Sequence, residues 1–110
     1  AAIRTGIQLL LTEFGYTEKD LDRVILAGAF GSGINLESAI AIGLLPNLPL
    51  DRFYDVGNAA GVGARLMLIS VAEREAAEAM ARQVQYLELA NHPDFARTFA
   101  TCLEFGASMV

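Results

Sequence analysis

Two glycine-rich segments carry the clearest chemical signal in this chain. In the first, the apolar run 24–27 leads directly into a turn, and Asn35 then offers a helix cap. The turn contains Gly28, Gly31 and Gly33. Glycine allows positive φ angles and the close approach of a ligand to the backbone, and a helix N-terminus attracts phosphate. The segment predicts a buried strand, a turn and a helix, arranged either as a nucleotide site or for tight packing.

The second segment repeats this order, because the strand expected over 53–56 is followed by glycine at the start of a helix to about residue 69. Small residues recur on one face of that helix: Gly57, Ala60, Gly61 and Ala64. Such a face either packs closely against another element, or it brings the helix N-terminus and the amide of Asn58 beside a nucleotide. Both interpretations stay open on the spacing alone.

The other reactive side chains have structural explanations. Pro93 suits the first position of a helix, so His92 is expected to be a cap rather than a base. Cys102 lies in an apolar helical stripe and is expected in the core. Among the aspartates, which tend to serve turns, only Asp55 stands close enough to Gly57 to be considered for ligand contact. The sequence therefore predicts no catalytic residue in this chain.

Composition narrows the function classes further. The 110 residues allow one small domain or part of a larger one, and 54% of them are apolar, more than such a domain easily buries. A net charge of −5 with scattered basic residues argues against nucleic-acid and membrane partners. One cysteine and one histidine cannot form an iron–sulfur cluster or a conventional zinc site. The lone thiol and the lack of a secretory signal predict a cytoplasmic protein.

The remaining elements are expected from apolar periodicity and from caps. They are a helix over 3–14 closed by Gly15, a capped turn over 17–20, a helix over 70–83, a strand over 84–89 and a helix from Pro93. Gly6 interrupts the first helix at a cost of ~1 kcal/mol relative to alanine, so it is expected to mark a close contact. The whole is predicted to be a single α/β unit over residues 1–110 that ends in a helix–strand–helix extension.

Two familiar phosphate motifs are disfavoured. The glycines of the first turn are spaced G-x-x-G-x-G, whereas a Rossmann turn requires G-x-G-x-x-G. The Gly-Lys-Ser/Thr ending of a P-loop is also missing from the sequence.

Three blocks in order, 26–33, 37–46 and 56–64, together resemble the C-terminal end of the reductive activators of corrinoid proteins. The later segments 84–90 and 92–95 are similar to the same region. That family consists of iron–sulfur proteins with an ATPase domain of the acetate/sugar kinase, heat-shock chaperone and actin type. The resemblance implies a partial ribonuclease H-like, actin-like ATPase subdomain, cut from the C-terminal end of a longer protein.

The resemblance also implies a site and a set of partners. Residues 26–32 look like the adenosine motif of that superfamily, which implies nucleotide contacts at Gly28, Ala29, Phe30, Gly31, Ser32, Gly57 and Asn58. The parent protein would bind ATP with Mg²⁺ and pass electrons from a [2Fe–2S] centre to a cobalt(II) corrinoid protein of a methyltransferase system. The partners would be the rest of its ATPase domain, that corrinoid protein and a second copy of itself.

This sequence lacks the family's phosphate-binding hairpins with their carboxylates and its cysteine motif, so the chain alone is expected not to be an enzyme. The alternative is a non-catalytic docking or oligomerisation module on the same scaffold, in which the glycines serve packing only.

Overall fold

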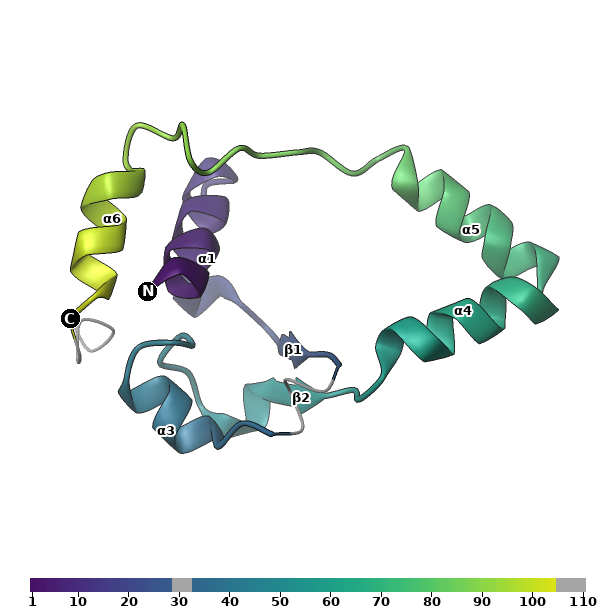
Figure 1. The fold of residues 1–110 in the computed structure, drawn as a ribbon, viewed down its shortest axis with the longest axis horizontal. Helices are drawn as coiled ribbons and strands as arrows, with labels where there is room; N and C mark the ends of the chain where they lie inside the picture. The colour runs from purple at the N-terminus through teal and green to yellow at the C-terminus, as the bar shows by residue number, and fades with distance from the viewer. Residues whose placement is uncertain (29–32, 105–110) are drawn as a thin grey trace. The chain divides into compact units, whose positions relative to one another are not determined.

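A computed structural model describes residues 1–28 and 33–104 of the chain (Figure 1). Their contacts divide into two compact units. The first unit holds residues 1–24, 34–54 and the described residues from 87 on, and the second holds 25–33 and 55–86. None of the helices in these described ranges is long and apolar enough to cross a membrane.

Helix α1 (Ala2–Glu13) opens the first unit and ends as the sequence predicts. Gly15 follows it with a φ of 77°, and the Tyr16 N–H donates to the Leu11 carbonyl at 2.8 Å. This left-handed glycine closes the helix in the usual way. The 3₁₀ helix η1 (Glu18–Asp20) follows with the predicted capping box between Thr17 and Asp20.

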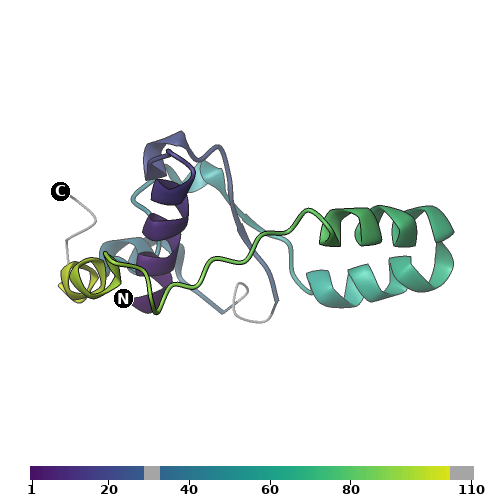
Figure 2. The same cartoon turned by 90° about the horizontal axis from the view of Figure 1, so that it is seen from above.

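The periodic apolar residues that predict a helix over 3–14 do not form the buried face of α1. Arg4, Thr5, Gly6 and Leu9 are buried, while Phe14, one of the periodic apolar residues, is 58% exposed. The buried face lies in the first unit, where α1 runs beside α6 (Phe95–Cys102; Figures 1 and 2). A Cβ at Gly6 would come within 3.4 Å of the Leu89 Cδ1 atom. The predicted close contact at Gly6 is therefore confirmed.

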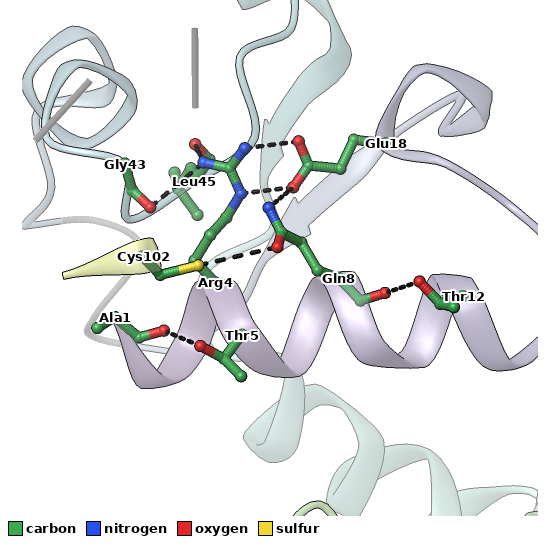
Figure 3. A network of polar contacts seen from close by, with 9 residues as sticks. All are labelled: Ala1, Arg4, Thr5, Gln8, Thr12, Glu18, Gly43, Leu45 and Cys102. Atoms are coloured by element: carbon green, nitrogen blue, oxygen red, sulfur yellow. Dashed lines mark hydrogen bonds and ion pairs between the residues drawn. The ribbon is translucent and has the colours of Figure 1, made fainter. Parts of the chain in front are cut away.

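A buried arginine holds three segments of the first unit together (Figure 3). The Arg4 side chain donates through Nε and Nη2 to the two carboxylate oxygens of Glu18, at 2.5 and 2.6 Å. Its Nη1 atom donates to the carbonyls of Gly43, at 3.3 Å, and Leu45, at 3.0 Å. Arg4 is only 2% exposed, so these bonds replace its hydration. We call this arrangement the Arg4 clamp.

Replacing Arg4 by methionine is expected to lower the free energy of unfolding by about 3–5 kcal/mol, because Glu18 would lose its cationic partner and two carbonyls would lose their Arg4 donor. Arg97 provides the matched control, since its ion pair with Asp94 is exposed to solvent. Arg97→Met should cost below about 1 kcal/mol. Urea unfolding of the 110-residue chain measures both, and equal effects would show that the clamp adds nothing to stability.

The strands are short and pair with each other. β1 (Val24–Leu26) and β2 (Phe53–Asp55) form a two-stranded sheet and lie in the expected segments. Helix α3 (Leu36–Ala41) lies between them in sequence, with the 3₁₀ helix η2 (Leu50–Arg52) after it. Asn35 caps α3 as predicted, because its Oδ1 atom accepts from the Ser38 N–H at 2.9 Å. β1 is not buried on both faces within this chain.

Two helices form a hairpin in the second unit (Figure 1): α4 (Ala59–Ile69) and α5 (Val71–Ala81). Ser70 separates them, as the sequence predicts, and its Oγ atom accepts from the Glu73 N–H at 3.2 Å. Large apolar side chains of the hairpin are exposed, among them Leu68 at 80% and Ile69 at 75%. Part of the high apolar content of the chain is therefore exposed to solvent on this hairpin.

The predicted C-terminal extension needs correction. Residues 84–89 form no strand, because alternation makes a strand only where a neighbour supplies a hydrogen-bond ladder, and the described sheet contains only β1 and β2. Helix α6 begins at Phe95, two residues later than expected. The delay arises because His92 Nδ1 accepts from the Asp94 N–H at 3.1 Å, which holds residues 92–94 in a turn.

Candidate functional site

The two glycine turns meet within the second unit. The Gly28 N–H donates to the Gly57 carbonyl at 2.6 Å, and the Val56 N–H donates to the Leu26 carbonyl at 3.0 Å. These bonds lie at the ends of β1 and β2, so the pairing of the two strands brings the two turns next to each other. The sequence predicts the turns separately, and the structure joins them by a direct backbone bond.

Gly28 and Gly57 both take conformations that favour glycine. Their φ angles are 81° and 63°, in the left-handed region that other residues enter only with strain. Apart from the glycines and their chain neighbours, no heavy atom of the described residues lies within 4 Å of the position that a Cβ would occupy at either residue. Among the described residues, close packing therefore does not explain these two glycines.

Asp55 supports the second turn from within. Its Oδ1 atom accepts from the Gly57 N–H at 2.9 Å, two residues along the chain. This is the local turn that aspartate commonly forms with its own backbone. The sequence offers Asp55 as the one aspartate to consider for a ligand, but here its carboxylate fixes the conformation of Gly57.

Asn58 is the N-cap of α4. Its Oδ1 atom accepts from the Gly61 N–H at 3.0 Å. A Cβ at Gly61 would lie 2.4 Å from Asn58 Nδ2, which is the end of a flexible side chain and can shift. The cap therefore does not require glycine at position 61, since Ser38 and Glu73 carry side chains at the equivalent positions of α3 and α5. Gly63, two residues further on, has open space around it.

Three predicted contact residues, Gly28, Gly57 and Asn58, are brought together by these bonds. Ala29, Phe30, Gly31 and Ser32 lie outside the described residues. Sequence reasoning missed the positional role of Asp55. The spacing contains its signal, an aspartate two residues before a glycine.

Comparison with known proteins assigns the chain to a family. The model of the C-terminal domain of RACo, described as the ASKHA domain, matches residues 1–109. The chain belongs to this family. ASKHA denotes the acetate and sugar kinase, heat-shock chaperone and actin type of domain, so the expected family resemblance and partial actin-like α/β fold are confirmed.

A curated relative extends the comparison. The corrinoid activation enzyme RamQ from Eubacterium limosum is 38% identical over 110 residues, which cover 100% of this chain. They cover 18% of RamQ, so this ASKHA segment corresponds to a small part of that enzyme.

The residues of this ASKHA segment do not fit an iron–sulfur centre. The sequence contains one cysteine, Cys102, which is buried and whose Sγ donates to Gln8 Oε1 at 3.8 Å. The described residues hold no group of three or more side chains suited to a metal ion. A four-thiolate cluster would need ligands from outside the 110 residues.

Proposed function

We propose that this ASKHA segment forms the adenosine side of the nucleotide site in an ATP-dependent activator of corrinoid proteins. The observation that carries the proposal is the bonded pair of open glycine turns, Gly28 and Gly57. Membership of the RACo C-terminal family and the name of the relative RamQ support the corrinoid part. The proposed contact residues are Gly28, Gly57 and Asn58, together with 29–32.

The chemistry of the turns fits the adenosine part of ATP. A purine ring can lie against glycine backbone that carries no side chain. Because the Oδ1 atom of Asn58 is engaged by the Gly61 N–H, Asn58 would address a ligand through its Nδ2 hydrogens. The described residues hold no group of three or more side chains suited to a metal ion, and we propose that residues outside this chain supply the main contacts to Mg²⁺ and the phosphates.

Bound ATP can drive a reaction only through different affinities for two conformations of the protein. In the proposed reaction of the parent protein, a reduced [2Fe–2S] centre gives up one electron and cobalt(II) of the corrinoid becomes cobalt(I). This segment would sense the nucleotide and form one side of the clamp that couples its binding to electron transfer. The lone thiol agrees with a reducing cytoplasm as the place of this reaction.

The isolated 110-residue chain is expected to bind Mg·ATP weakly or undetectably and to show no ATPase activity. Contacts to adenosine alone lack the charge-assisted phosphate and Mg²⁺ interactions that dominate nucleotide affinity. Calorimetry with Mg·ATP on the isolated chain and on the parent protein measures both. Micromolar binding with turnover by the isolated chain would contradict the proposed division of the site.

A docking or oligomerisation module is the second candidate function. The exposed apolar side chains of the α4–α5 hairpin favour it, because patches of this kind mark interaction surfaces. The same calorimetry separates the two candidates. A parent protein that binds no Mg·ATP would leave docking as the function of this segment.

A further inference from the structure

We propose that Asp55 is a positioning residue for the two glycine turns, although it is not expected to touch the nucleotide. Asp55 acts through Gly57. This inference rests on the proposed nucleotide site and adds to it a residue that holds the two turns in place.

Gly57 links the two glycine turns through its backbone hydrogen bonds. Its N–H donates to Asp55 Oδ1 at 2.9 Å, while its carbonyl accepts from the Gly28 N–H at 2.6 Å and from the Ala59 N–H at 2.9 Å. Glycine has more conformational freedom than any other residue, so an unsupported Gly57 would sample many orientations. The Asp55 carboxylate restricts that freedom and thereby keeps the acceptor in place for Gly28.

Asp55 could instead serve as a ligand of Mg²⁺, and the two roles make opposite demands. Positioning needs only an acceptor oxygen at Oδ1, which asparagine also supplies and which suits the same turn. A metal ligand needs the negative charge, which asparagine lacks. Asp55→Asn therefore distinguishes the roles, and Asp55→Ala removes both.

The test uses three variants of the full-length parent protein: Asp55→Ala, Asp55→Asn and Gly63→Ala. Gly63→Ala is the control, because it adds a methyl group to the same segment in open space. Calorimetry with Mg·ATP gives the affinity, and hydrogen exchange of the Gly28 amide without nucleotide gives the order of the turns. We expect Asp55→Ala to weaken binding by about tenfold and to speed exchange at Gly28. Asp55→Asn and Gly63→Ala should match the wild type in both.

Each other outcome overturns a stated part. Wild-type affinity and exchange in Asp55→Ala would overturn the positioning role while leaving the nucleotide site intact. Equal losses of affinity in Asp55→Asn and Asp55→Ala, with exchange at Gly28 unchanged, would make Asp55 a metal ligand. A wild-type parent that binds no Mg·ATP would overturn the proposed function itself, and unchanged exchange in Asp55→Ala would then overturn the positioning role as well.

Discussion

Replacing Gly28 by valine in the parent protein is expected to weaken Mg·ATP binding by roughly a hundredfold or more while the far-ultraviolet circular dichroism stays native. The φ angle of Gly28 is 81°, which a β-branched residue avoids. The valine side chain would also enter the open space where the base is proposed to lie. Calorimetry on the purified variant measures the loss.

Gly15 supplies the control for backbone strain. It has a φ of 77° and open space at its Cβ position, but it lies in the first unit at the end of α1. Gly15→Val therefore carries a similar conformational cost without filling the proposed site. Equal losses of affinity in both variants would show that valine acts by destabilising the fold, and native affinity in Gly28→Val would contradict the adenosine assignment.

Deleting residues 1–110 from the parent protein is expected to abolish ATP-stimulated reduction of a cobalt(II) corrinoid protein. The absorption spectrum of the proposed [2Fe–2S] centre should survive, because this chain has a single cysteine and the ligands of such a cluster would lie elsewhere. Reduction of the corrinoid is followed by the absorbance change from cobalt(II) to cobalt(I), with and without Mg·ATP.

Gly28→Val provides a second route to the same conclusion, since it keeps the segment in place. Both proteins should show the rate seen without nucleotide, whether or not Mg·ATP is added. A truncated protein that still responds to ATP would show that the coupling resides outside this segment and that the segment is scaffold.

Local chemistry explains the elements that could be predicted from the sequence. The caps at Asn35, Asn58 and Ser70 each bond an N–H three residues along the chain, so nearby residues alone determine them. Gly15 closes α1 for the same local reason. These caps gave correct starts for α3, α4 and α5.

Features that depend on distant partners could not be predicted in this way. The Arg4 clamp joins residues that are 14, 39 and 41 positions apart in sequence, and no local pattern indicates that an arginine will be buried. The strand expected over 84–89 lacks a neighbour in the described sheet, and Ile25 of β1, predicted to be buried, is 59% exposed. Alternating or apolar residues indicate a preference for a strand, but whether the strand forms and is buried depends on the segments that pack against it.

In the candidate site, the glycines were predictable because positive φ and open backbone are properties of glycine itself. The bond from the Gly28 N–H to the Gly57 carbonyl was not, because it depends on how β1 and β2 pair. The role of Asp55 follows only once its bond to the Gly57 N–H is known.

Photolabelling of the parent protein with 8-azido-ATP tests most directly whether this segment holds adenosine. Trypsin cleaves after Arg23, Arg52 and Arg65, so every proposed contact residue falls in one of two peptides, 24–52 or 53–65. If this segment holds adenosine, we expect label in one or both of these peptides, and we expect that label to be lost when excess Mg·ATP competes. Competed label confined to other peptides, with 24–52 and 53–65 unmodified, would contradict this expectation.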